Sequence, residues 1–258
     1  MKVIATVAAL LFICSGLAWA EVDLFNAEDY NFELEGRYWR PKLDSTVKLV
    51  ENGIGTDIKL VDDLGFDDQK DFGEARGQLK FFGKHKFNFS YLPLKWDADT
   101  TLPRTIEFNG QTFTAGIRVQ SKLEMKMFKG GYEYDLIAGR YGFLGFTFDV
   151  LLADTFMEIK APSMALDEKY DSTVPVPMVG LSGRITPIKW VSLTGKISGL
   201  PMGGIGYILD AEASLDINPV KYVGISVGYR FLRMDLEYDD NKADFRLDGP
   251  FAALKVRF

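Results

Sequence analysis

The chain has 258 residues and carries 30 lysine and arginine residues against 36 aspartate and glutamate residues, a formal net charge of −6. Binding to nucleic acid phosphates needs a basic surface, so this acidic balance excludes nucleic acid as the expected partner. Hydrophobic residues make up 47% of the chain. No run of about 18 apolar residues follows residue 20, which excludes transmembrane helices there, so a membrane would have to be crossed by strands.

The first 20 residues have the composition of a cleaved export signal. Lys2 is followed by an apolar stretch over residues 3–13, and residues 18–20 read Ala-Trp-Ala, which suits a cleavage site. About 11 apolar residues are too few to cross a bilayer, which takes roughly 20. We therefore expect residues 1–20 to be removed and residues 21–258 to form a single exported domain.

Ten stretches of alternating polar and apolar residues follow, with turn residues between them. A period of two is the pattern of strands, and its repetition at short spacing is typical of an all-β barrel or sandwich. The 20 Phe, 11 Tyr and 25 Gly residues also favour sheet and turn over helix. The stretches cover residues 31–40, 72–82, 86–96, 117–135, 143–159, 174–186, 190–200, 205–217, 222–237 and 243–258.

The connections between these stretches alternate in length. Four are short, at residues 83–85, 137–142, 186–189 and 218–221. Five are mostly longer and more polar, at residues 41–71, 97–116, 160–173, 201–204 and 238–242. Short turns on one rim and long loops on the other are the plan of outer-membrane barrels, with the short rim in the periplasm. We predict a closed antiparallel up-and-down transmembrane β-barrel of about ten strands, with eight or twelve as alternatives and both termini at the short rim.

Two local features refine this prediction. Residues 105–113 form alternating segments around Asn109-Gly110, a pair that favours a type I′ hairpin turn, and we expect the barrel wall to extend beyond the membrane there. Pro177 and Pro250 fall inside predicted strands. We expect bulges there, because proline cannot donate a ladder hydrogen bond.

Alternation alone does not say which face of the barrel is apolar. A soluble barrel that holds an apolar ligand has the same period with the opposite orientation. Aromatic residues gather near the ends of the stretches, as they do in the girdles of membrane barrels. We therefore expect apolar side chains to face lipid and charged ones to fill the lumen. The predicted lumen charges are Glu33, Glu35, Arg37, Glu74, Arg76, Lys80, Arg118, Lys122, Glu124, Lys126, Asp149, Arg184, Lys196, Asp210, Glu212 and Arg230.

The last eight residues, 251–258, place apolar side chains at alternate positions and end in Phe258. With Leu254 and Val256, this strand resembles the signal read by the barrel assembly machinery of the outer membrane. As architecture, the whole chain is similar to small outer-membrane barrels such as the OmpA transmembrane domain and OmpX, and its strand count matches the omptin proteases. The resemblance implies residence in the outer membrane and contact with lipid and lipopolysaccharide. It brings no catalytic or ligand motif to this sequence.

The sequence offers little for catalysis or metal binding. His85 is the one histidine and lies in a predicted short turn, where a solvated side chain is expected. Because the one cysteine, Cys14, lies in the export signal, no zinc site can be assembled in the exported domain. An acidic cluster at residues 62–68 lacks the spacing of a calcium loop, so surface solvation is favoured over calcium or cation-bridged lipopolysaccharide. We expect no catalytic residue, no metal and no cofactor.

Three functions remain open from the sequence. The first is a structural barrel or a narrow passive channel whose lumen is filled by mixed charges and whose loops make surface contacts. Eight strands enclose a lumen that side chains just fill, whereas water-filled porins need about 16 to 18, so ten strands favour a filled lumen. The second is a soluble exported barrel that binds an apolar ligand. The third is an outer-membrane hydrolase that works without histidine, with paired carboxylates among Asp62, Asp63, Asp67 and Asp68.

Overall fold

The computed structural model describes residues 30–258 except residues 52–54, 140, 189, 202, 204, 205 and 239. The predicted export signal lies outside the described residues. Within them there is one short 3-10 helix, η2 (Pro162–Met164), and no helix with the length and hydropathy of a membrane span. The strands are β1 (Phe32–Trp39), β2 (Lys42–Lys48), β3 (Ile58–Lys59), β4 (Phe72–Phe81), β5 (His85–Thr101), β6 (Ile106–Phe108), β7 (Gln111–Phe113), β8 (Arg118–Gly139), β9 (Gly142–Ala161), β10 (Leu166–Ile188), β11 (Val191–Pro201), β12 (Gly206–Val220), β13 (Val223–Tyr238) and β14 (Asn241–Arg257).

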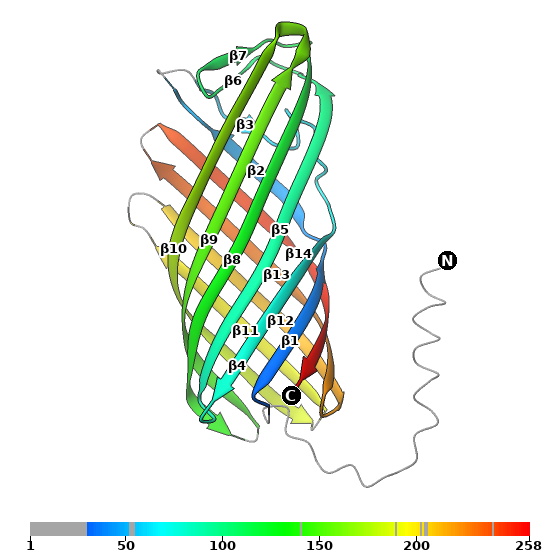
Figure 1. Ribbon diagram of the computed structural model, residues 1–258, viewed down its shortest axis with the longest axis vertical. Coiled ribbons are helices and arrows are strands. Elements are labelled where there is room, and N and C mark those ends of the chain that lie inside the picture. The colour runs from blue at the N-terminus through cyan, green and yellow to red at the C-terminus, as the bar shows by residue number, and fades with distance from the viewer. Residues whose placement is uncertain are drawn as a thin grey trace, which may run out of the picture.

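The main sheet closes on itself into a barrel, because β1 pairs with both β4 and β14 (Figure 1). β2 pairs with the preceding part of β14, so β1 and β2 form one barrel strand that is interrupted at Arg40 and Pro41. Proline explains the interruption, since it has no N–H for the ladder. Counted in this way, the barrel has ten antiparallel strands in sequence order, and the predicted all-β up-and-down barrel is confirmed.

The two rims of the barrel differ. The lower rim in Figure 1 carries the tight turns, the start of β1 and the C-terminus, and we call it the short-turn rim. At the opposite, long-loop rim, β5, β8, β9 and β10 reach well above the other strands (Figure 1). The connection predicted at residues 160–173 is mostly strand, because β9 runs to Ala161 and β10 begins at Leu166. A tall wall therefore rises from one side of the barrel.

The hairpin of β6 and β7 forms as predicted around Asn109 and Gly110, which both have positive φ (49° and 81°). The expected extension of the barrel wall at this connection is confirmed, since the β5–β8 ladder continues to the pair Thr101–Arg118. The hairpin itself pairs with no barrel strand. Burial of apolar surface decides its position. Its apolar side chains, which are fully buried in the barrel's hydrophobic cluster, are Ile106, Phe108 and Phe113.

The predicted bulges at Pro177 and Pro250 are absent, since the ladders run through both residues without a register shift. Register shifts occur close to the short-turn rim instead, at residues 135–137, 185–188 and 217–220. A proline disturbs a ladder only where its missing N–H would have donated a hydrogen bond. The sequence pattern does not show whether a proline lies where the N–H would donate to the ladder or where it would not.

Residues of the first long connection, between β2 and β4, complete the upper part of the barrel wall. The ladder between β4 and β5 ends at the pair Ala75–Tyr91, and the next outward residue of β5 is Pro93, which cannot donate to a further strand. Residues 58–71 fill the place above, where β3 pairs with β2 and Gly65 lies against Thr100 of β5. This segment turns apolar side chains into the barrel, namely Ile58, Leu60, Leu64 and Phe66.

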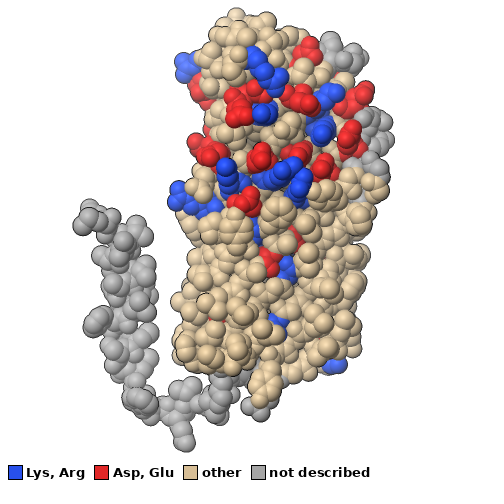
Figure 2. Space-filling view, turned by 180° about the vertical axis from the view of Figure 1, so that it is seen from behind, with Lys and Arg blue, Asp and Glu red and all other residues tan. Residues whose placement is uncertain are grey.

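The two faces of the wall exchange polarity partway along the strands. On β8, the outward positions are mostly charged from Arg118 to Lys126 and are aromatic or glycine from Phe128 to Tyr134. Its inward positions change at the same level from buried apolar residues, such as Met127, to charged ones. Near the short-turn rim the barrel is thus apolar outside and charged inside, and in the upper half the order is reversed. Figure 2 shows this, with Lys, Arg, Asp and Glu gathered over the upper half.

Candidate functional site: a charged lumen below an apolar plug

A layer of ion pairs crosses the lumen near the level at which the faces exchange polarity. We call it the ion-pair layer. It contains four cations and four anions from β1, β4, β8, β12 and β13, and the side chain of each is less than one fifth exposed. Its members are Arg37, Arg76, Lys129, Arg230, Glu35, Glu74, Asp210 and Glu212. Buried charges are tolerated only when they are paired, and the equal numbers of cations and anions meet this condition.

Glu74 of β4 lies at the centre of the ion-pair layer, and its side chain is fully buried. Its carboxylate oxygens lie 2.9 Å from Arg76 Nε, 3.2 Å from Arg230 Nη1 and 3.7 Å from Arg37 Nε. Three guanidinium groups therefore share this carboxylate, each in addition to a contact with Glu212 or Asp210. Loss of this carboxylate would leave cationic charge without a counter-ion in a buried place.

Glu212 of β12 ties the layer across the barrel. It accepts a hydrogen bond from Arg37 Nη1 at 2.8 Å, and it accepts bonds from Arg76 Nη1 and Nη2 at 2.8 and 2.9 Å. β13, β14 and β1 separate β12 from β4 in the wall. The paired, fork-like contact between Arg76 and Glu212 thus spans the lumen, and such bidentate pairs fix geometry as well as charge.

Asp210 holds the other end of the layer. It accepts hydrogen bonds from Arg230 Nε and Nη2 at 2.8 and 2.9 Å, and from Lys129 Nζ of β8 at 2.6 Å. The guanidinium of Arg230 also lies 5.0 Å from the ring of Trp39, which belongs to the hydrophobic cluster above. The charged layer and the apolar layer are therefore in direct contact.

Further ion pairs lie between this layer and the short-turn rim. Asp216 accepts a hydrogen bond from Lys255 Nζ at 2.8 Å and others from the hydroxyls of Thr194 and Ser226. Lys86 Nζ, fully buried, lies 2.9 Å from Glu133 and 3.0 Å from Asp135. Arg257 and Glu33 form another pair, at 2.5 Å. Charged groups thus fill the lower lumen as well.

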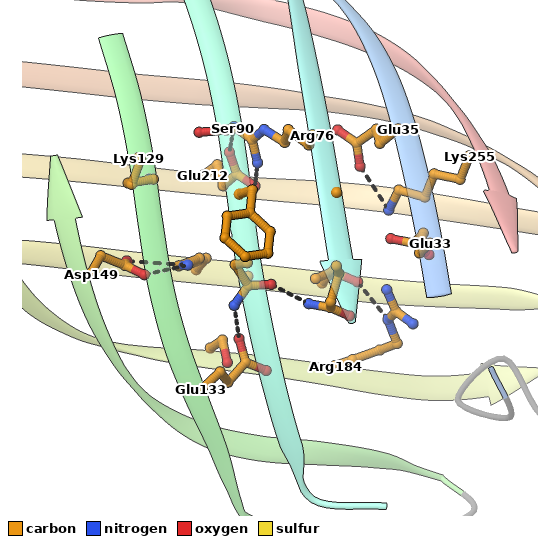
Figure 3. A pocket seen from close by; sticks show the side chains of 18 of the residues that line it. Glu33, Glu35, Arg76, Ser90, Lys129, Glu133, Asp149, Arg184, Glu212 and Lys255 are labelled. Carbon is orange, nitrogen blue, oxygen red and sulfur yellow. Dashed lines mark hydrogen bonds and ion pairs between the residues drawn. The ribbon is translucent and has the colours of Figure 1, made fainter. Parts of the chain in front are cut away.

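A cavity of about 120 Å³ remains within this lower lumen (Figure 3). Side chains of both signs line it, so it has no preference for either sign of charge. Asp149, which lines the cavity, lies close to Gly131 of β8, where a Cβ would be 1.9 Å from Asp149 Oδ1. Asp149 in turn lies 3.2 Å from Lys196 Nζ. At roughly 30 Å³ per water molecule, the cavity has room for a few waters and not for a large solute.

The structure places twelve of the sixteen predicted lumen charges inside the barrel. It brings most of them together in the ion pairs described above. These twelve are Glu33, Glu35, Arg37, Glu74, Arg76, Lys80, Asp149, Arg184, Lys196, Asp210, Glu212 and Arg230. The network that they form is wider than the prediction, which omitted lumen residues that lie on the same alternating faces. The omitted residues are Lys86, Lys129, Glu133, Asp135, Asp216, Lys255 and Arg257.

The other four predicted lumen residues, Arg118, Lys122, Glu124 and Lys126, lie on the outer face, and their predicted orientation is wrong. Arg118 has a side chain that is 75% exposed and pairs with Asp99, while Lys122 pairs with Glu124 at 3.0 Å. The residues that alternate with them point inward and are buried. Since this part of β8 stands above the membrane level, its charged face contacts water and its apolar face fills the barrel.

Above the ion-pair layer the lumen is closed by apolar side chains. We call the inserted part the plug, and it consists of residues 58–66 and the β6–β7 hairpin. It packs against inward side chains of β5, β8, β9, β10, β13 and β14. Five of the buried side chains in the hydrophobic cluster are methionines, whose adaptable shape suits an irregular contact. They are Met125, Met127, Met157, Met178 and Met234.

An ion pair holds the plug to the chain that follows β5. Asp63 accepts hydrogen bonds from Arg104 Nε at 2.8 Å and Nη2 at 2.6 Å, and from the N–H of Lys59 at 2.8 Å. Burial opposes ionisation of Asp63, but the Arg104 guanidinium and the Lys59 N–H outweigh it, so the pKa of Asp63 is lowered from its usual value. The charged form of Asp63 is therefore favoured in the folded plug.

This ion pair predicts an acid-sensitive plug. Because the pKa of Asp63 is lower in the folded state, its contribution is fully present above the unfolded value of about 3.9 and is lost as the pH falls through the lower folded value. Asp63→Asn should reproduce the acid form at neutral pH. We expect faster proteolysis within residues 55–71, with the heat-modifiable barrel band unchanged. Asp62→Asn, next to it and exposed, is the matched control, and equal cleavage of both variants would contradict the role of Asp63.

The structure gives contacts for three of the remaining sequence candidates, His85, Asp62 and Asp63. His85 is not a solvated turn residue, because its Nδ1 lies 2.6 Å from the Tyr132 hydroxyl and its ring contacts Tyr134. In the acidic cluster, Asp62 pairs with Lys59 at 3.3 Å while Asp63 pairs with Arg104. In the part of the chain that the structure describes, no group of three acidic, histidine or cysteine side chains is placed to hold a metal.

The outward side chains of the lower half form an uncharged belt. On β9 it spans residues 144–152, nine residues, and a tilted membrane strand needs about 9 to 11. The first outward charges above it are Lys95, Lys126, Asp154, Arg233 and Asp248. A closed barrel with such a belt and a charged lumen is an integral outer-membrane β-barrel, the class that the sequence predicted. The belt overturns the alternative of a soluble barrel, whose exterior would be polar.

Comparisons with solved structures agree with this class. The fold is similar to that of the outer membrane protease OmpT from Escherichia coli, with 10% sequence identity, a TM-score of 0.57, and coverage of 90% of this chain and 100% of that one. It is also similar to the translocator domain of the autotransporter NalP from Neisseria meningitidis, with 10% identity, a TM-score of 0.51, and coverage of 100% and 98%. Identities this low show the fold alone. No protein-family model and no curated protein matches the sequence.

Proposed function

We propose that this protein is a closed outer-membrane barrel that anchors a rigid, charged wall at the cell surface and does not act as an open pore. The observation that carries the proposal is that two barriers of different chemistry lie in series in one lumen. The ion-pair layer occupies the membrane level, and the plug occupies the level above it.

Each barrier alone opposes the passage of solutes. The ion-pair layer places Arg76 and Glu212 in a two-point contact across the lumen, so a hydrated ion would have to break buried ion pairs in order to pass. The plug fills the next level with side chains that exclude water, such as Leu60, Leu64 and Phe66. A charged solute that could enter the ion-pair layer would be opposed by the apolar plug, and an apolar solute would be opposed by the layer. This combination supports a closed barrel over a selective channel.

The tall wall supports a role at the surface. Its outer face carries charges of both signs that pair with one another, for example Arg118 with Asp99 at 2.6 Å. Lys95 and Lys126 occupy the first outward positions above the uncharged belt. Phosphates of lipopolysaccharide would lie at this level, and lysine is a suitable partner for them. A non-enzymatic role belongs to this proposal, which is supported by the pairing of Asp62 with Lys59 and of Asp63 with Arg104.

Single-channel recording in planar bilayers tests the closed barrel. The four proteins to compare are the wild type, a plug variant (L60S/L64S/F66S), a layer variant (R76A/E212A) and the combination of both. We expect stepwise conductance only from the combined variant, because either barrier alone blocks the lumen. A heat-modifiable gel shift establishes that each variant is folded.

The surface pair Lys122 and Glu124 provides the control. K122Q/E124Q removes two charges from the same barrel without touching either barrier, and it should remain silent. Conductance from the wild-type protein would overturn the proposal. Conductance from the plug variant alone would show that the ion-pair layer is no barrier.

A further inference from the structure

Every tight turn of the short-turn rim carries an exposed aromatic side chain. The turn between β4 and β5 has Phe82, and the next three turns have Tyr141, Trp190 and Tyr222. All four are more than half exposed, and they continue downward from the uncharged belt. Aromatic rings favour the boundary between hydrocarbon and headgroups, so these residues mark the level of the inner-leaflet headgroups.

Phe82 is the most informative of these residues. It is 97% exposed, and its φ is +49°, a left-handed conformation that a bulky residue rarely adopts. Gly83 follows with φ +74°. Asparagine would suit the position of Phe82 better in a turn surrounded by water. A fully exposed phenyl ring in an unfavourable backbone conformation is explained if the ring lies against lipid.

The same turns are basic. Lys84 and Lys221 are exposed beside Phe82 and Tyr222, and no acidic side chain occurs among the described residues of the four turns. In the sequence, Arg140 and Lys189 likewise precede Tyr141 and Trp190, but these two basic residues lie outside the described residues. On the strands beside these turns, Asp135 and Asp216 point into the lumen, where they pair with Lys86 and Lys255.

We infer that this rim binds anionic phospholipid headgroups of the inner leaflet, with Lys84 and Lys221 as the phosphate-binding residues and the turn aromatics as the contacts to the acyl boundary. Lysine contributes as a point charge near an anionic lipid surface. The continuity of the aromatic turns with the belt favours lipid over a soluble periplasmic protein, because the two surfaces form one face. This inference does not depend on whether the lumen conducts.

The distribution of tryptophan provides a local probe. Trp190 is half exposed at the rim, whereas Trp39 and Trp96 are buried in the barrel. The Trp190 carbonyl accepts a hydrogen bond from the Asn218 N–H at 2.7 Å, so this probe lies beside the turn that carries Lys221. Quenching of its fluorescence by lipids with brominated acyl chains therefore reports which lipid occupies that site.

The experiment uses the full mature chain refolded into vesicles that contain phosphatidylcholine and phosphatidylglycerol, with one or the other brominated. We expect Trp190 to prefer phosphatidylglycerol by about fivefold, the factor that corresponds to roughly 1 kcal/mol for one basic residue near an anionic surface. Lys221→Gln should abolish that preference. Trp190→Phe measures the background of the buried tryptophans, and added salt should weaken the preference.

A second set of variants tests the turn between β4 and β5, which carries Lys84. In the W190F background, Phe82→Trp places the probe beside Lys84, and there Lys84→Gln should remove the preference while Lys221→Gln should not. Lys126→Gln, at the opposite edge of the belt, is the matched control and should change neither probe. The absence of a lipid preference in the wild type, or an equal effect of all three lysine variants, would overturn the inference.

Discussion

Glu74→Gln is expected to destabilise the folded barrel by about 3 to 5 kcal/mol, the cost of removing one partner from a buried ion pair. The glutamine keeps the shape of the side chain but removes the charge that Arg37, Arg76 and Arg230 share. Urea unfolding in lipid vesicles, followed by the shift of the folded band on a gel, measures the effect. Among the lumen carboxylates described above, Glu74 is the one that contacts three guanidinium groups.

Two control variants distinguish the effect of an unbalanced buried charge from a general loss of stability on substitution. E74Q/R76Q removes one charge of each sign from the ion-pair layer, so it should recover part of the stability that Glu74→Gln loses. Glu124→Gln breaks a partly exposed ion pair with Lys122 on the outer face, and surface pairs contribute only about 0 to 1 kcal/mol. Equal losses for Glu74→Gln and Glu124→Gln would contradict the assigned positions of the two carboxylates.

Val227→Arg should cost ~2 to 4 kcal/mol of folding free energy, as expected for arginine on the lipid face near the membrane midplane. Val227 is an outward residue of β13, it pairs with Ala252 and Leu215, and it is about half exposed on the belt. The change should also slow insertion into vesicles. Folding yield and urea midpoint in thin and thick bilayers measure both effects.

Gln120→Arg is the matched variant for this test. Gln120 also faces outward, but it lies on β8 among charged residues in the upper half. Arginine there remains in water, so little change in the urea midpoint is expected. If both arginine variants lost the same stability, the boundary between the lipid-facing belt and the water-facing wall would be misplaced.

The fold could be predicted from the sequence because polar and apolar residues alternate with a strict period of two in each barrel strand. The ten predicted stretches correspond to the ten barrel strands, and the alternation of short and long connections placed the C-terminal strand at the correct rim. The same period concealed the exchange of polarity. On β8 the pattern of one charged and one apolar face continues past Met127 and Phe128, although the two faces trade places there.

A sequence signal for this exchange does exist. β8 has 22 residues, about twice what a membrane strand needs, so part of it must lie outside the bilayer. The outward face also changes from Lys126 to Phe128 within two residues, and β5 makes the corresponding change between Pro93 and Lys95. Strand length and the place of this change would have assigned Arg118 to the outer face.

The plug could not be predicted in the same way. Residues 58–66 have no long alternating pattern, and their apolar side chains are interrupted by Lys59 and by the pair Asp62 and Asp63. Leu64 and Phe66 are buried because the tall wall provides an apolar surface for them, which is a tertiary property. The residues of the proposed assembly signal are placed at the short-turn rim, where Phe258 stacks with Phe32. Recognition of that strand by the assembly machinery stays a prediction.

The exchange of polarity has a thermodynamic consequence. The apolar side chains of the lower half face lipid, whereas those of the upper half are buried away from water. The lower wall meets hydrocarbon, so its apolar side chains gain nothing from release of water once the chain is inserted. The upper half buries its leucines, methionines and tryptophan away from water, and its opening would carry the positive heat capacity of an ordinary globular core. The extracellular end of this membrane protein should therefore weaken on cooling, as a water-soluble domain does.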